Sequence, residues 1–221
     1  MSPEIVQLIA EATLDTLWMV AVATAIATLL GVPLGVFLAT SGRGELFALP
    51  AVNRIVGLVV NATRSTPFII LVVAIIPFTR LIAGTSIGTK AAIVPLTIAA
   101  IPFIARLVET AVREVDQGLV EAARAMGASP LQIVRKVLLP EAVPAIALSL
   151  TLAVVSMIGY SAMVGAVGGG GLGDLGIRYG YQRFMPDVMA AVVIVLIVLV
   201  QGVQTIGDTL ARRLNKRLRH N

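Results

Sequence analysis

Two glycine patterns in the C-terminal half of the chain have the spacing of sites that carry out chemistry. Gly171, Gly173 and Asp174 fall in a GxGD sequence, the arrangement in which membrane-embedded proteases carry one of two catalytic carboxylates. Such catalysis needs a second carboxylate at the same depth, with one group neutral and the other ionised. The chain has five aspartates, and none lies inside a confident hydrophobic span. The sequence therefore does not support proteolysis.

Gly168, Gly170 and Gly173 also match the GxGxxG pattern of nucleotide-binding loops. That pattern cradles phosphates only where a strand precedes it and a helix follows. Here no strand is expected before it, no lysine follows, and the loop is expected outside the cell, where nucleotide is scarce. We interpret the glycines as the flexible, close-packed outer loop in which a hydrophobic span ends.

Residues for other kinds of catalysis are nearly absent. The chain has no cysteine, which excludes disulfides and thiolate metal sites, and its one histidine, His220, lies in the last two residues. The ATP-binding motif GxxxxGKS/T occurs nowhere. We therefore expect no catalytic residue, no metal site and no cofactor bound by this chain.

Charged residues inside hydrophobic runs are the next candidates. Arg64 lies about nine residues into such a run, where a buried charge is costly unless it reaches an interface or a watery cavity. It either ties down backbone carbonyls freed by Pro67 or lines a transport route. Arg106, Glu109 and Arg113 are spaced three and four apart, which favours an ordinary ladder of ion pairs on one helix.

The uncharged stretch SMIGYSAMVG gathers the hydroxyls of Ser156, Tyr160 and Ser161 beside Met157 and Met163. Hydroxyls in hydrocarbon must find partners, so a lipid-facing helix has little use for them. Ser156, Tyr160 and Met163 lie three or four residues apart and share a face. They either fill a helix interface, where methionine packs adaptably, or line a route through the membrane.

The composition places all these residues in a lipid bilayer. Of 221 residues, 57% are hydrophobic and 13% are charged, and the mean hydropathy is +0.95. A water-soluble globule needs far more polar surface than this. We expect an all-α membrane protein, organised as a single transmembrane domain over residues 1–221.

Five hydrophobic runs are long enough to cross about 30 Å of hydrocarbon at 1.5 Å per residue. The second contains Arg64, and the third must continue past Ala105 to span. The first has no basic region before it and is interpreted as a retained helix. The expected spans are 17–40, 55–79, 91–111, 142–167 and 188–207.

The basic residues indicate orientation. A net charge of +5 could suggest nucleic acid, but on a membrane protein it more often reports which side is cytoplasmic. A cytoplasmic C-terminus leaves only Arg80, Lys90, Arg178 and Arg183 outside. It places the remaining basic residues outside the spans in the cytoplasm: Arg43, Arg54, Arg113, Arg124, Arg135, Lys136, Arg212, Arg213, Lys216, Arg217 and Arg219. We therefore predict an outer N-terminus and a cytoplasmic C-terminus.

The stretch EAARAMGASPLQIVRKVLLPEA, within a cytoplasmic loop at about 112–141, predicts two short helices at a sharp corner. Gly127 suits the left-handed residue that ends the helix Gly118–Met126. Ser129 and Gln132 form a capping signature that begins a second helix, Pro130–Leu139. We expect Pro140 and Pro144 to close that second helix before the next span.

The second helix carries an apolar stripe of Leu131, Val134 and Leu138, which we expect a protein to bury. Three interpretations of the corner compete. Ala123, Gly127 and Ile133 have spacings seen in helix-turn-helix DNA readers, but membrane spans replace the third helix that such domains need. A solvated connector needs neither cap nor stripe. A docking element for a cytoplasmic partner explains both.

The corner resembles the EAA motif of bacterial ABC importer permeases, which seats in a groove of the ATP-hydrolysing subunit. The resemblance is closest to methionine importer permeases, through RSTPFIILVV at 64, IPFTRLIAGTSIG at 76, AAIVPLTIAAIPFIARLVE at 91, RAMGASPLQIVRKVLLPEA at 124 and GYSAMVGAVGGGGLGDLG at 159. The residues that it implies for ATPase coupling are Glu121, Ala122, Ala123, Met126, Gly127, Ala128, Ile133, Leu139 and Pro140.

The resemblance also implies a type I importer fold with a five-helix core and cytoplasmic coupling helices, and a homodimer of permeases. It implies two ATP-binding subunits that hold ATP and Mg, and an extracytoplasmic substrate-binding protein. The helix after the corner then faces the dimer axis, which favours a substrate pathway and gate at Arg64, Ser156, Tyr160, Ser161 and Met163.

The expected function is therefore ATP-driven import of methionine, D or L, and close analogues across the bacterial inner membrane. The chain itself is expected to be a transport subunit rather than an enzyme. A permease for another amino acid, and a membrane scaffold or channel without ATPase coupling, are the alternatives. A channel would need no docking corner, whereas a permease for another amino acid would.

Overall fold

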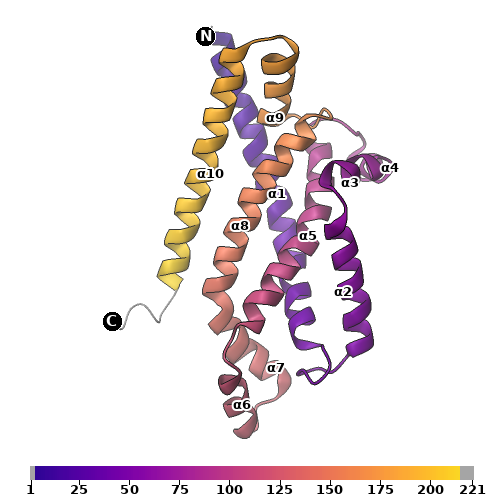
Figure 1. The fold of residues 1–221 in the computed structure, drawn as a ribbon, viewed down its shortest axis with the longest axis vertical. Helices are drawn as coiled ribbons and strands as arrows, with labels where there is room; N and C mark the ends of the chain where they lie inside the picture. Colours follow the sequence, from indigo (N-terminus) through magenta and orange to yellow (C-terminus); the bar gives the residue numbers. More distant parts are fainter. Residues whose placement is uncertain (1–2, 215–221) are drawn as a thin grey trace.

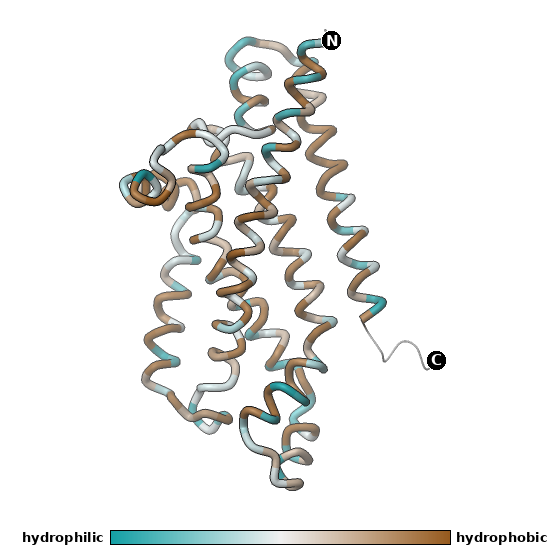
Figure 2. Tube along the Cα trace, turned by 180° about the vertical axis from the view of Figure 1, so that it is seen from behind, coloured by the Kyte–Doolittle hydropathy of each residue, from teal (hydrophilic) through white to brown (hydrophobic). Residues whose placement is uncertain are grey.

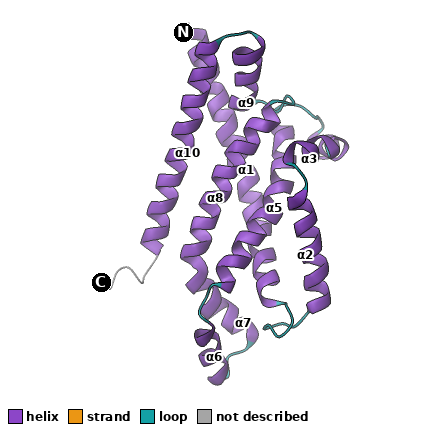
Figure 3. Cartoon of the chain, in the orientation of Figure 1, coloured by secondary structure: helices purple, strands orange, loops and turns teal. Residues whose placement is uncertain are grey.

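The computed structural model describes residues 3–214, and these are almost entirely helical. Figures 1 and 3 show long helices running side by side along the long axis, with short helices at both ends. His220, Lys216, Arg217 and Arg219 lie outside the described residues. The helices are α1 Pro3–Thr40, α2 Pro50–Ser65, α3 Phe68–Ala74, α4 Ile76–Ala83, α5 Thr89–Arg113, α6 Gln117–Ala125, α7 Pro130–Ile133, the π-helical turn η1 Val134–Leu138, α8 Leu139–Gly165, α9 Gly171–Leu175, the π-helical turn η2 Gly176–Gln182, and α10 Pro186–Leu214.

The predicted all-α membrane fold is confirmed. Among the described residues, α1, α5, α10 and the helix running from α7 through α8 are each long and apolar enough to cross a membrane. The bent pair of α2 and α3 makes a fifth candidate span. Hydrophobic residues dominate along the long helices, and hydrophilic residues gather toward the two ends of the molecule (Figure 2). The ends therefore have the polarity of the two aqueous sides.

Helix α1 begins at Pro3, fourteen residues before the expected start of the first span. The expected span starts at residue 17 because the charged residues Glu4, Glu11 and Asp15 lie before it. Charged residues on one face of a helix do not end the helix. Ile9 and Ala12 are buried in a cluster with Leu172 and Val188, while Glu4 and Glu11 are exposed. The extension is amphipathic and packs on α9 and α10.

The expected continuous span 55–79 is wrong, because the second crossing is broken. Helix α2 ends at Ser65, and α3 leaves it at an angle of 102°. Pro67 lacks a backbone N–H and clashes with helical geometry in the preceding residue. Thr66 accordingly takes the extended angles φ −79° and ψ 124°. Helices α3 and α4 then lie across the long axis instead of along it (Figure 1).

The prediction that Pro140 and Pro144 close the second corner helix is also wrong. Residues 130–165 form one continuous helix, in which the π-helical turn η1 lies just before Pro140. A proline ring inside an α-helix clashes with the carbonyl one turn earlier, and a π-helical turn inserts an extra residue into that turn. The corner is thus joined to α8 without a break.

The glycine run is close-packed, as predicted. It contains α9, which packs directly on α1 and α8. A Cβ on Gly165 would lie 2.3 Å from the backbone nitrogen of Asp174, and one on Gly173 would lie 2.4 Å from the carbonyl oxygen of Ala162. The backbone N–H of Leu172 donates to the Thr16 hydroxyl at 2.9 Å. Close backbone approach explains Gly165 and Gly173, and left-handed φ values of 73° to 82° call for glycine at positions 168, 170 and 171.

Helices α1 and α5 form the centre of the bundle. Ala23, Ala27, Gly31 and Gly35 are spaced four residues apart on α1, and both alanines are fully buried. A Cβ on Gly35 would lie 2.4 Å from the carbonyl oxygen of Ala105. Small residues at this spacing let membrane helices pack closely. This pair provides the frame to which the other helices attach.

Candidate functional site

The turn of the corner between α6 and α7 has the geometry that its sequence predicts. Asp116 caps the start of α6, and its side chain accepts from the Gly118 N–H at 2.8 Å. Gly127, two residues after the end of α6, has a left-handed φ of 79°. The Ala128 N–H donates to the Ala123 carbonyl at 3.0 Å, which completes a glycine-ended helix terminus. The predicted left-handed glycine is therefore confirmed.

The second half of the corner is capped as expected. The Ser129 side chain accepts from the Gln132 N–H at 3.4 Å, and the Gln132 side chain accepts from the Ser129 N–H at 2.8 Å. Pro130 occupies the first helical position, where a missing N–H costs nothing. Two reciprocal bonds and a proline fix the direction in which the chain leaves the corner.

The apolar stripe of the corner is mostly covered by this chain itself, contrary to the expectation that a partner buries it. Val134 and Leu138 are 6% and 5% exposed, and they pack in one cluster with Val120 of α6 and with the core of α1, α5 and α8. Only Leu131 of the stripe is largely exposed, at 57%. The buried residues serve to bind α6 rigidly to the bundle.

The residues proposed for ATPase coupling therefore divide into three groups by burial. Ala123 and Ile133 are buried and support the corner from within. Ala128 and Leu139 are half-buried. Those that are exposed and accessible to a partner are Glu121, Ala122, Met126, Gly127 and Pro140, with Met126 the most prominent at 81% exposure.

The proposed pathway residues on α8 also differ in how exposed they are. Met163 is 49% exposed, and Ser156 and Tyr160 are half-buried on the same face. The Tyr160 ring stacks on Phe68 of α3, with centroids 4.4 Å apart and an interplanar angle of 11°. The broken second span thereby covers part of this face.

Ser161 does not lie on this face, and its assignment to the pathway is wrong. Its side chain is 1% exposed and donates to the Ile158 carbonyl at 2.7 Å. Met157 is fully buried in the core. Because neighbouring residues on a helix point about 100° apart, a cluster in the sequence does not form a cluster on one face.

Arg64 lies in the last turn of α2 and is exposed. It forms no hydrogen bond or ion pair within residues 3–214, so it does not tie down the carbonyls beside Pro67. Nearby hydroxyls do so instead: Ser65 donates to Asn61, and Thr66 donates to Ala62. Arg64 lies about 21 Å along the helix axis from the start of α2.

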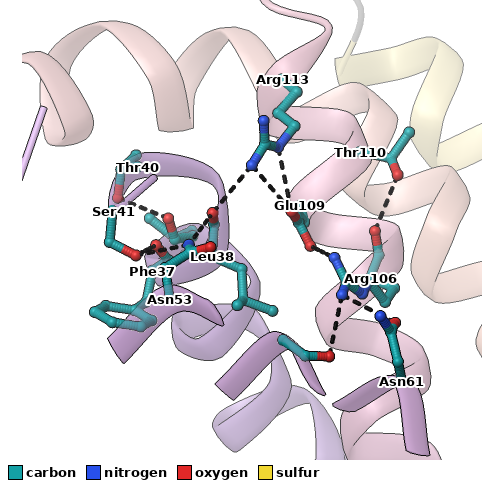
Figure 4. A network of polar contacts seen from close by, with 12 residues as sticks. Phe37, Leu38, Thr40, Ser41, Asn53, Asn61, Arg106, Glu109, Thr110 and Arg113 are labelled. Carbon is teal, nitrogen blue, oxygen red and sulfur yellow. Dashed lines mark hydrogen bonds and ion pairs between the residues drawn. The ribbon is translucent and has the colours of Figure 1, made fainter. Parts of the chain in front are cut away.

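The expected ion-pair ladder on α5 is confirmed, and it also connects three helices (Figure 4). Glu109 is 7% exposed and pairs with both Arg106 and Arg113. Arg106 also donates to the Asn61 side chain of α2 at 2.9 Å, and Arg113 donates to the Leu38 carbonyl of α1 at 3.3 Å. A buried carboxylate is tolerated where it is paired in this way.

Asn53 of α2 completes this network. Its side-chain amide donates to the Leu38 carbonyl at 2.8 Å and to the Ser41 hydroxyl at 2.9 Å. The same carbonyl therefore serves α2 and α5 at once (Figure 4). These polar bonds hold α1, α2 and α5 together next to the corner, at the end of the bundle where α6 begins.

The comparison with known families agrees with this geometry. Residues 31–220 match the family described as "Binding-protein-dependent transport system inner membrane component". The chain belongs to this family. It is therefore a multi-pass inner-membrane permease subunit of a transporter, with the all-α permease fold described above.

Relatives with high identity cover most of the permease. The "Probable D-methionine transport system permease protein MetI" of Vibrio cholerae is 59% identical over 210 residues, which are 95% of this chain and 93% of the relative. The "D-methionine transport system permease protein MetI" of Escherichia coli K12 is 50% identical over 165 residues, which are 75% of this chain and 76% of the relative.

Two solved structures are also similar. An inward-facing structure of the MetNI methionine ABC transporter has a chain 48% identical to the permease, with a TM-score of 0.95 and coverage of 98% of this chain and 100% of that one. The crystal structure of an amino acid ABC transporter with histidines has a TM-score of 0.78 at 20% identity, with 94% of each chain covered. The second similarity shows the fold alone.

Proposed function

We propose that this permease imports methionine, in D or L form, and close analogues, using ATP hydrolysed by partner subunits. The observation that carries the proposal is the extent of the likeness to methionine transporters. Identity of 59% runs across 95% of the chain, and the TM-score of 0.95 covers 98% of it. The likeness includes the corner and α8, and so is not limited to the hydrophobic periodicity that unrelated membrane helices share.

The proposed assembly is a homodimer of this chain with two ATP-binding subunits, which hold ATP and Mg, and an extracytoplasmic substrate-binding protein. One chain offers one docking corner, whereas a pair of ATPases needs two. The exposed apolar residues on α8, including Leu148, Leu152 and Met163, give a two-fold partner a surface to cover. Lipid faces α10, on which Ile194, Ile197 and Val198 are each more than half exposed.

The proposed orientation places the N-terminus outside and the C-terminus in the cytoplasm. Five crossings put the start of α1 and the end of α10 at opposite ends of the bundle, as Figure 1 shows. The corner, with Arg124, Arg135 and Lys136, lies at the same end as the last turn of α10. That basic end is the cytoplasmic one by the positive-inside rule.

The coupling mechanism follows from the rigid attachment of the corner. Val120 of α6 packs in one hydrophobic cluster with Val134 of η1 and Val108 of α5. Residues 130–165 then run as one helix from the corner to Met163 and beyond. A displacement of α6 by a moving ATPase is therefore transmitted along α8 to the outer half of the membrane. Close-packed interiors transmit such displacements because they compress little.

Substrate selectivity tests the proposal most directly. The permease is reconstituted in vesicles with its ATPase and binding protein, and ATP-driven uptake of labelled L-methionine is measured against competing amino acids. We expect D-methionine and close thioether analogues to compete and histidine not to compete. Uptake that is insensitive to methionine but blocked by another amino acid contradicts the substrate assignment, while uptake without ATP contradicts the coupling.

Met163 is proposed as the gate residue, because it is exposed, compliant and apolar on the face of α8 that turns away from the core. We predict that Met163→Cys, in a chain without other cysteines, crosslinks to its two-fold copy and that the crosslink blocks uptake. The matched control is Met157→Cys, which is buried and should not crosslink. Failure of Met163→Cys to crosslink in any nucleotide state, with normal uptake by Met163→Lys, places the route elsewhere.

A further inference from the structure

A basic cleft lies at the cytoplasmic end of the bundle, beside the corner. It has a volume of about 210 Å³ and is bounded by the end of α1 with the loop after it, the end of α5, and α6. Three arginines line it, Arg43, Arg113 and Arg124, against a single carboxylate, Glu45. The buried side chains of Val120 and Leu138 also contribute to its wall. An excess of two positive charges next to an apolar wall favours a ligand that joins an anionic group to a hydrocarbon part.

The arginines are available to a ligand to different degrees. Arg43 and Arg124 are exposed and form no ion pair or hydrogen bond with any residue from 3 to 214. Arg113 shares Glu109 with Arg106, yet its side chain is still 48% exposed. The Glu109 charge is therefore divided between two guanidiniums, and it does not neutralise the cleft.

The cleft lies on the side of α6 away from Ala122 and Met126, two of the exposed residues proposed for ATPase coupling, whereas Glu121 lies between the two sides. Gln117, Val120 and Arg124 line the cleft, and at about 100° per residue their mean direction is roughly 160° from that of Leu119, Ala122 and Met126. The latter three are exposed. A partner seated on Met126 leaves the cleft facing the bundle and the membrane boundary.

The loop that forms one wall carries side chains suited to lipid tails. Phe47 and Leu49 are 42% and 48% exposed, only a few residues after Arg43. Backbone bonds hold them in place, from the Phe47 N–H to the Thr40 carbonyl and from the Leu49 N–H to the Ser41 carbonyl, each 3.0 Å. Apolar side chains beside a guanidinium at the cytoplasmic boundary match the two parts of a phospholipid.

We propose that this cleft binds the phosphate of an anionic phospholipid from the inner leaflet, with Arg43 and Arg124 as its principal ligands. The bound headgroup bridges the loop after α1 to α6, so it stabilises the attachment of the corner to the bundle. Basic pockets between membrane helices on the cytoplasmic side are suited to such headgroups. The ligand chemistry is a phosphodiester anion, and the lipid rather than free phosphate is its source because of the apolar wall and the adjacent Phe47.

The test measures lipid retention by the permease purified with its ATPase. The delipidated complex is mixed with phosphatidylglycerol or phosphatidylcholine in neutral detergent, and bound lipids are counted by native mass spectrometry. We expect phosphatidylglycerol to be retained over phosphatidylcholine. Arg43→Gln and Arg124→Gln should each lower its affinity about fivefold, the effect of one basic residue near a membrane surface. Arg43→Lys should keep most of the affinity because it keeps the charge.

Arg54→Gln is the matched control, since Arg54 is an exposed cytoplasmic arginine of α2 outside the cleft. It should leave retention unchanged. Arg43 lies outside the corner, so its variant separates loss of lipid from loss of the ATPase. Equal retention by wild type and both glutamine variants overturns the proposal. Displacement of phosphatidylglycerol by a modest excess of inorganic phosphate also overturns it, because the cleft is then a site for free anions.

Discussion

The corner around α6 and the outer segment around α9 are both short helical pieces with glycines between two long helices, but they are stabilised in opposite ways. Gly127 has open space around it, and only its φ of 79° calls for glycine. Gly165 and Gly173 have no positive φ, but backbone atoms of neighbouring segments lie within 2.5 Å of the position that a Cβ would take. The first glycine is needed by its own conformation and the others by their neighbours.

The difference also separates function from structure. The corner exposes Met126 and Glu121 to solvent at the end of the molecule, where a partner can reach them. In α9, Leu172 is fully buried and Leu175 nearly so. The GxGD sequence that suggested chemistry is therefore a packing element, and Asp174 forms an ion pair with Arg178 on the same helical stretch. A solvated, locally capped segment is the better candidate for binding.

The largest effect is expected from Gly165→Val. Its Cβ would overlap the backbone of residues 173 and 174, and backbone cannot move aside as a flexible side chain can. Overpacking in a tight core costs about 1 to 3 kcal/mol, and a backbone clash should exceed that range. We expect the purified variant to melt at a lower temperature and to aggregate in detergent. Gly202→Val in α10 is the control, because nothing lies within 4 Å of its Cβ. If both variants melt like wild type, α9 is not packed on α8 as described.

Gly127→Val should have a smaller effect on stability and a larger one on coupling. A β-branched residue in the left-handed region costs about 1 to 2 kcal/mol, and the open surroundings add no clash. We expect insertion in the membrane to be unchanged, while the altered corner loses ATPase association and ATP-driven uptake. Gly127→Asn tests the cause, since asparagine tolerates this conformation and should retain more uptake. Full uptake by Gly127→Val contradicts the docking role of the corner.

The same distinction explains what the sequence could and could not predict. The turn of the corner, from Gly127 to Gln132, is predictable residue by residue, because Gly127, Ser129 and Gln132 act on backbone groups within four positions of themselves. The position of α9 depends on Thr16, more than 150 residues away, and no local pattern reports that contact. The break at Pro67 was visible as a proline, but hydropathy alone extended the span across it.

The position of Ser161 departs from the expected pathway for a related reason. Hydroxyls in a hydrophobic run suggest a polar face, but Ser156 and Ser161 each donate to a carbonyl of their own helix. A helix backbone supplies such acceptors along its whole length, so a membrane serine needs no pathway. Ser161 accordingly belongs to the core. The exposed face of α8 is predictable from the spacing alone. Ser156, Tyr160 and Met163 lie three or four residues apart, and this spacing places them on one side of the helix.

Removing one hydrogen bond in each region compares the two directly, and the smaller effect is expected in the corner. Thr16→Val removes the acceptor for the Leu172 N–H, which is fully buried, so we expect a loss of about 1 to 3 kcal/mol for an unsatisfied donor. Ser129→Ala removes the cap of α7, and water can replace it, so the loss should be nearer 0.5 kcal/mol, at the low end for such caps. Thermal unfolding in one detergent measures both. Hydrogen exchange locates the change, which should spread through α1 and α9 in Thr16→Val and stay within residues 129–133 in Ser129→Ala. If both variants lose the same stability and both show exchange changes only near the substitution, the segment around α9 depends on long-range packing no more than the corner does.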